Sequence, residues 1–159
     1  MTTKRQKITP FLWFDTEAGE AAAFYMTVFP DSRMLTPEQY NDTPSGTVDI
    51  FTIELFGQQF ALMNAGPYFK INEAISFVID CKDQEEVDYY WDRLTADGGE
   101  ESMCGWLKDK FGVSWQVVPE RFIELANDED KEKAQRVMQA MLKMKKLDIA
   151  ALERAYRGE

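Results

Sequence analysis

Hydrophobic and polar positions follow two different periods along the chain, and the change of period separates short strands from amphipathic helices. An apolar, aromatic-rich run ending in aspartate occurs at Pro10–Asp15 and recurs 65 residues later at Ile75–Asp80. Each run precedes apolar residues at i, i+3 and i+7, namely Ala22, Tyr25 and Phe29, then Val87, Tyr90 and Leu94. Such runs predict buried strands, and the spacing predicts helices that pack on them. A strand–helix unit therefore occurs twice in this sequence.

A second repeat follows each helix at a shorter offset. The segment Phe56–Met63 matches Phe111–Val118, and each begins with a Phe-Gly turn that joins two strand-like runs. These patterns predict β-hairpins. The first half holds about ten extra residues within 35–46, whose Pro, Asn-Asp and Ser-Gly content predicts a loop. The sequence thus predicts two βαβββ modules, at residues 8–66 and 73–120.

The last part of the chain has a different pattern. From Asp128 onward it is rich in helix formers, with Ala134, Val137, Met141 and Met144 on one stripe, and Asp148 is placed to cap a helix over 149–156. We interpret the stripe as packing against the core or a second subunit, and a Met-bearing binding surface is the alternative. Two domains are therefore predicted, a body at 1–126 and a helical extension at 127–159.

Composition and charge exclude several functions for this chain of 159 residues. It has no histidine, which excludes Ser-His-Asp and Cys-His nucleophile systems and HExxH zinc sites. Residues 1–126 carry 10 basic and 21 acidic side chains, whereas residues 127–159 carry 8 and 7. The formal net charge of −10 repels phosphate backbones, so we expect no nucleic-acid partner.

The sequence also bears on compartment and redox state. Its start has positive charges but no apolar run of signal-peptide length, and no apolar stretch approaches 18 residues. We therefore expect a cytoplasmic protein without a membrane partner. Cys81 and Cys104 form neither a CxxC pair nor a disulfide framework, and they are interpreted as reduced core or edge residues.

The motifs resemble those of the vicinal oxygen chelate superfamily, which includes glyoxalase I, the bleomycin-resistance proteins and extradiol dioxygenases. The PhnB-like branch, also labelled 3-demethylubiquinone methyltransferase-like, is similar at Ile8–Phe14, Ala21–Tyr25, Phe29–Ser32, Gly66–Phe69 and Gly105–Pro119. The resemblance implies an α+β fold in which two βαβββ modules form a glyoxalase-like half-open barrel, followed here by the C-terminal helices. It also implies a homodimer.

Metal-using members of this superfamily place one ligand on the first strand and one on a late strand of each module. The resemblance puts these positions at Thr9, Ala61, Ala74 and Gln116. Only Gln116 offers a plausible ligand, and one neutral amide does not hold a divalent ion against water. We therefore predict no metal and no cofactor. Glu73 is the nearest ionisable alternative for the third position, and the favoured interpretation of it is a solvated loop carboxylate.

Methyltransferase activity is not expected from the sequence. Rossmann-type enzymes that use S-adenosylmethionine need a Gly-rich turn between a strand and a helix, with an acidic residue further on. The two strand–helix junctions, at residues 15–19 and 80–83, lack that turn. The family label is therefore interpreted as a name rather than an activity.

Strand alternation places a set of side chains from both modules on the faces that the resemblance assigns to a cavity. They are mostly apolar, aromatic or neutral hydrogen-bonding groups: Phe11, Trp13, Gln59, Ala61, Met63, Ser76, Ser114 and Gln116. They either line a binding cavity for a small uncharged or planar ligand or fill the space as ordinary core. The function favoured by the sequence is a metal-free protein that binds an unidentified small molecule. The alternative is an enzyme of lyase, isomerase or dioxygenase type, with or without metal.

Overall fold

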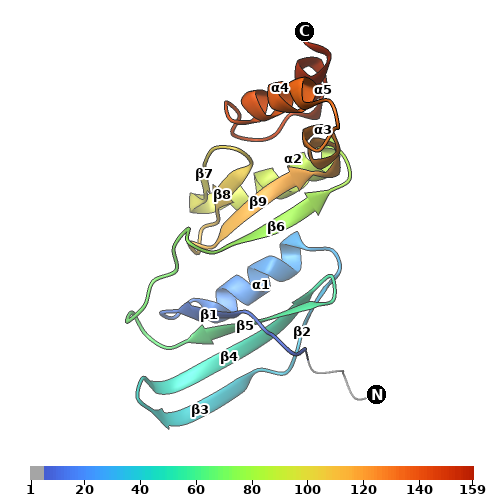
Figure 1. Cartoon of the computed structure of the whole chain (residues 1–159). Coiled ribbons are helices and arrows are strands. Elements are labelled where there is room, and N and C mark those ends of the chain that lie inside the picture. The colour runs from blue at the N-terminus through green and yellow to red at the C-terminus, as the bar shows by residue number, and fades with distance from the viewer. Residues whose placement is uncertain (1–5) are drawn as a thin grey trace. The chain divides into compact units, whose positions relative to one another are not determined.

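The computed structural model describes residues 6–159. Residues 1–5, which belong to the predicted body and to the predicted start of the chain, lie outside the described residues. The chain divides into two compact units, 1–71 and 72–159 (Figure 1). The first unit comprises β1 (Phe11–Phe14), α1 (Ala18–Val28), β2 (Ser32–Met34), β3 (Glu38–Thr43), β4 (Gly46–Leu55) and β5 (Gln58–Asn64). Its sheet has the order β1-β5-β4-β2, with β1 parallel to β5, and β3 also pairs with β4.

The second unit repeats this plan and adds helices. It comprises β6 (Ser76–Cys81), α2 (Gln84–Thr95), the 3-10 turn η1 (Ala96–Gly98), β7 (Glu100–Glu101), β8 (Trp106–Lys108), β9 (Ser114–Pro119), α3 (Glu120–Ala126), α4 (Lys131–Met141) and α5 (Ile149–Arg157). The sheet order is β6-β9-β8-β7, with β6 parallel to β9. The predicted α+β class with two related modules is confirmed, and the first module has one strand, β3, more than the predicted βαβββ pattern.

The predicted loop over 35–46 is wrong for half of its length, because Glu38–Thr43 forms strand β3. This strand pairs antiparallel with β4, with Gln39 opposite Asp49. Its register shifts between Tyr40 and Thr43, where Asp42 takes a φ of 57°. The turn-forming residues are thus accommodated as an irregularity within an exposed edge strand. Pairing with β4 outweighs the local preference for a loop.

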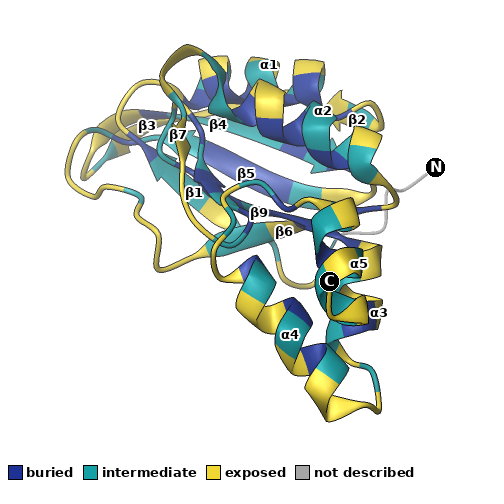
Figure 2. Ribbon diagram, turned by 90° about the horizontal axis from the view of Figure 1, so that it is seen from above, coloured by how far each residue is buried: buried dark blue, intermediate teal, exposed yellow. Residues whose placement is uncertain are grey.

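Helix α1 covers one face of the first sheet and α2 covers one face of the second. Along both helices buried residues alternate with exposed ones, as the colours in Figure 2 show. Two side chains start them: Asn64 Oδ1 accepts the Ala18 N–H at 2.7 Å, and Asp83 Oδ1 accepts the Glu86 N–H at 2.9 Å. The second contact makes Asp83 the N-cap of α2, and it shows why that helix begins after Asp83.

Within the second unit, the three C-terminal helices pack around one apolar cluster. It contains Leu125, Val137, Met141, Leu147 and Leu152, and half-buried Cys104 packs against it. The predicted stripe is buried at three of its four positions, whereas Met144 follows the end of α4 and is half-buried. Backbone bonds from Cys104 N–H to Met144 O (2.7 Å) and from Gly105 N–H to Lys145 O (2.8 Å) join the extension to the loop before β8. The cap at Asp148 is confirmed, since its Oδ1 accepts the Ala151 N–H at 3.0 Å.

The core around α2 predicts a loss of stability at alkaline pH. Burial raises the pKa of Cys81 from 9.0 to about 12 and that of Tyr90 from 10.0 to about 12. The unfolded chain ionises these groups first, so their contribution is complete below about pH 9 and is lost as pH rises toward 12. We expect a lower urea midpoint at about pH 10.5 than at about pH 8. The Cys81→Ala variant should show a smaller decrease, and an equal decrease in both proteins would contradict the assignment.

Candidate functional site

The face of the first sheet opposite α1 carries the predicted residues of the first module. Phe11 pairs with Ala61, and Trp13 pairs with Met63, so their side chains share a face. Gln59 lies two residues before Ala61 on the same face. The intervening side chains face α1, as the contact between Asn64 and the start of that helix requires. We call this surface, with Phe11, Trp13, Gln59, Ala61 and Met63, the first open face.

The first open face is aromatic at its β1 edge. The Trp13 indole donates to Gly66 O at 2.8 Å and meets the Phe69 ring edge-on, with 5.0 Å between ring centroids. Phe11 and Phe69 are 55% and 59% exposed, so the aromatic edge is open to solvent. Ala61, in contrast, is buried. Phe11 and Phe69 are thus available for contact at this edge, and the hydrogen bond fixes the orientation of the Trp13 ring.

The second sheet has an equivalent open face opposite α2, with two rows of side chains across it. Lys108, Ser114 and Ser76 form one row on β8, β9 and β6, because Ser114 is the partner of both other residues. A neighbouring row consists of Trp106, Gln116 and Val78. We call these six residues the second open face. Three of the predicted site residues, Ser76, Ser114 and Gln116, therefore lie together.

Hydrogen bonding within the second open face is incomplete. Gln116 Nε2 donates to Ser76 Oγ at 2.9 Å. Ser114 is only 2% exposed, and its Oγ has no hydrogen-bond partner among residues 6–159. A buried hydroxyl without a partner is uncommon in folded proteins. The surface therefore has one hydroxyl whose hydrogen-bonding capacity is unused.

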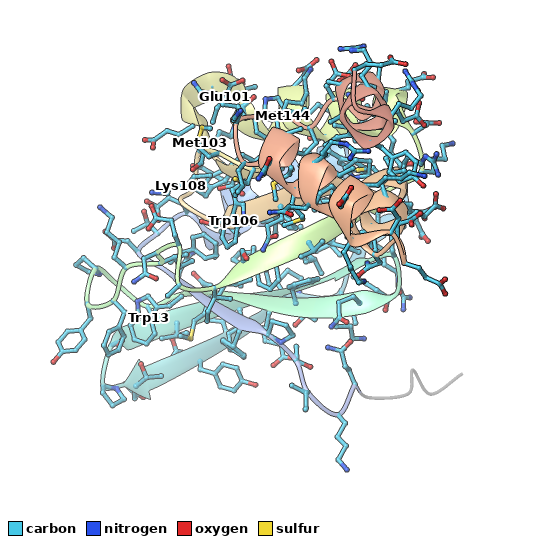
Figure 3. All side chains as sticks on the ribbon, turned by 45° about the horizontal axis from the view of Figure 1, so that its top comes forward. Trp13, Glu101, Met103, Trp106, Lys108 and Met144 are labelled. Carbon is cyan, nitrogen blue, oxygen red and sulfur yellow. The ribbon has the colours of Figure 1, made fainter. Side chains whose placement is uncertain are left out.

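Two residues of the second open face, Trp106 and Lys108, are not among the predicted site residues, and they lie two apart on β8 (Figure 3). Lys108 Nζ forms an ion pair with the Glu73 carboxylate. Their hydrogen bond raises the pKa of Lys108 and lowers that of Glu73, so both stay charged at neutral pH. Knowledge of the β8–β9 register would have placed Trp106 opposite Gln116 and Lys108 opposite Ser114. Strand alternation then puts both residues on this face.

The four metal positions implied by the superfamily do not fit a divalent cation. Thr9 offers one hydroxyl, which lies 3.4 Å from Gln6 Nε2, and Ala61 and Ala74 offer only methyl groups. Gln116 offers an amide that is already bonded to Ser76. Divalent ions in proteins need several oxygen, nitrogen or sulfur donors. Within residues 6–159, no cluster of three or more Cys, Asp or Glu side chains is arranged to hold a metal.

The structure also gives partners to Asn64 and Glu73. Asn64 serves as the acceptor for the first amide of α1, so its side chain belongs to the helix start. Glu73 is paired with Lys108 rather than solvated alone. In the described part of the chain, none of the helices is both long and apolar enough to cross a membrane.

Comparison with solved structures identifies the fold of the chain. The chain is similar to protein PA1353 from Pseudomonas aeruginosa (23% identity, 73% of this chain and 98% of that chain, TM-score 0.57). It is also similar to the fosfomycin resistance protein FosX from Listeria monocytogenes (16% identity, 78% and 97%, TM-score 0.55). At these identities the likeness shows the fold alone. Together with the two modules, it shows that this chain has the fold of these two proteins.

The particular family follows from two further matches. The family model described as 3-demethylubiquinone-9 3-methyltransferase matches residues 6–118. The PhnB protein from Bacillus cereus is 31% identical, over 72% of this chain and 99% of that chain, with a TM-score of 0.63. The chain therefore belongs to this PhnB-like family. Comparison with curated proteins finds no match. Helices α3, α4 and α5 lie beyond the residues that the family model matches.

Proposed function

We propose that this protein binds a small molecule on its open sheet faces without a metal ion. The observation that supports the proposal is the composition of those faces. They present indole rings, hydroxyls and an amide, whereas the positions of metal ligands in superfamily relatives hold two alanines, one threonine and one glutamine. An apolar surface with a few hydrogen-bonding groups is typical of sites for small planar ligands.

The start of α1 also supports binding rather than methyl transfer. Cofactor sites of Rossmann type use free amides at a helix N-terminus after a glycine-rich turn. The chain has Asp15, Thr16 and Glu17 at this junction, and the Ala18 amide is bonded to Asn64. We therefore propose that the methyltransferase name of the family does not describe the activity of this chain.

We further propose that the protein is a homodimer. Strand β1 lies at one edge of the first sheet, and β6 lies at one edge of the second. Within residues 6–159, neither strand has a second partner in its own sheet. Open edges of this kind are commonly covered by pairing. The exposed aromatic side chains Phe11, Tyr68 and Phe69 near the β1 edge add apolar area that a second copy could bury.

Purified full-length protein tests these proposals in one series of measurements. We expect elemental analysis to find no stoichiometric metal, and melting temperatures to change by less than about 1 °C when Mn²⁺, Ni²⁺, Zn²⁺ or Mg²⁺ is added. Light scattering should give twice the chain mass of 18.4 kDa. Stoichiometric metal or a clear metal-dependent stabilisation would overturn the metal-free proposal and favour a metal enzyme. A mass of one chain would overturn the dimer.

A further inference from the structure

We propose that the second open face binds a small planar oxyanion, such as an aromatic carboxylate, and that Lys108 receives its negative group. The proposal rests on the proposed function, since it names the ligand class for the same site. It draws only on residues of the second unit. Its basis is the juxtaposition of one ammonium group, two hydroxyls and one indole ring on adjacent strands.

The geometry of the sheet brings these groups within reach of a single ligand. Directly paired residues on neighbouring strands have Cβ atoms about 4.5–5.5 Å apart, and residues two apart on one strand lie about 7 Å apart. Lys108, Ser114 and Ser76 are therefore consecutive polar groups across three strands. Trp106 lies beside Lys108 on the same face. A bicyclic aromatic acid matches the extent of this surface.

The hydrogen-bonding balance of the surface favours an acceptor as ligand. Ser76 Oγ already accepts from Gln116, so its own hydrogen is available for donation. Ser114 Oγ is buried and has no partner within residues 6–159, and the Lys108 ammonium has three hydrogens of which Glu73 does not use all. The Lys108 ammonium and the two serine hydroxyls can therefore each donate to a ligand, and a carboxylate supplies acceptor oxygens only.

Glu73 occupies the place that the carboxylate of the ligand would take. Its side chain is 61% exposed and lies on the segment before β6, whereas the Lys108 side chain is 31% exposed on β8. Exposed ion pairs contribute little to stability and exchange readily. Glu100, the partner of Lys108 on edge strand β7, is a second exposed carboxylate that keeps the ammonium charged. The ligand carboxylate therefore exchanges with Glu73 as the ion-pair partner of Lys108.

A matched pair of probes tests the inference: 2-naphthoate and its neutral analogue 2-naphthamide, titrated by calorimetry into the full-length protein in the presence of a metal chelator. We expect 2-naphthoate to bind at least about tenfold more tightly. Lys108→Met should abolish this preference, and Lys110→Met at the hairpin tip should keep it. Glu73→Gln, which removes the competing carboxylate, should strengthen 2-naphthoate binding several-fold.

The outcomes separate this inference from the proposed function. If both probes bind equally, or if Lys108→Met or Glu73→Gln leaves the preference unchanged, the oxyanion inference is overturned and small-molecule binding stands. If neither probe binds, the oxyanion inference is overturned, and the proposed function is decided by the metal analysis and melting temperatures described above. Ser114→Ala gives a further arm, in which we expect a higher melting temperature without ligand and weaker 2-naphthoate binding. Unchanged 2-naphthoate binding in that variant would also overturn the inference.

Discussion

Replacing Asp109 with alanine should destabilise the protein by about 3–5 kcal/mol, because it leaves several buried donors without an acceptor. Asp109 is 2% exposed within the turn between β8 and β9. Its Oδ1 accepts the Phe111 and Val113 N–H groups at 2.9 and 3.1 Å, and its Oδ2 accepts the Trp115 indole N–H at 2.9 Å. Val113 and Trp115 are themselves buried, so water does not replace the lost acceptor. Urea unfolding at fixed protein concentration measures the change.

Two further variants make this expectation specific. Asp109→Asn retains a carbonyl oxygen for the backbone amides but loses the bond to the indole, so we expect an intermediate loss of about 1–3 kcal/mol. Asp80→Ala removes an exposed carboxylate from β6 in the same unit and should change stability by less than about 0.5 kcal/mol. If Asp109→Ala cost no more than Asp80→Ala, the carboxylate would not be holding the turn.

The parts of the fold that could be predicted from sequence are those that depend on near neighbours along the chain. The apolar spacing of Val87, Tyr90 and Leu94 reports a helix face directly, and all three side chains are buried. Asp83 and Asp148 act on amides three residues later, so their caps are also local. Strand β3 shows the limit, since its exposed, polar residues become a strand only through pairing with β4.

The candidate site shows the same limit more strongly. Alternation along single strands places Ser76, Ser114 and Gln116 on one face, and the structure brings them together. The ion pair between Glu73 and Lys108 joins residues far apart in sequence, and the burial of Ser114 Oγ depends on surrounding side chains. Neither is encoded in a local pattern. The charge of the site therefore follows from the register of the β8–β9 hairpin, which composition and spacing do not determine.

That hairpin is joined to the C-terminal helices at Gly105, where even a methyl group should be costly. The residue has a φ of +81°, donates its N–H to Lys145 O at 2.8 Å and accepts the Val117 N–H at 2.8 Å. A Cβ at this position would lie 2.9 Å from Val117 O and 3.2 Å from Leu147 Cγ. The first contact is with backbone that belongs to β9, so it cannot be relieved by a change of rotamer. Leu147 is buried in the cluster beneath the helices.

Gly105→Ala should therefore lower the free energy of unfolding by more than the left-handed backbone conformation alone explains. Gly112→Ala provides the matched comparison. Gly112 has a φ of +86°, and a Cβ there would meet no atom within 4 Å. We expect Gly112→Ala to lose about 1–2 kcal/mol from backbone strain, and Gly105→Ala to lose about 1–3 kcal/mol more from the clash. Urea unfolding of both variants gives the difference. Equal losses would mean that β9 and Leu147 shift to accommodate the methyl group, and that the contact at Gly105 is loosely packed.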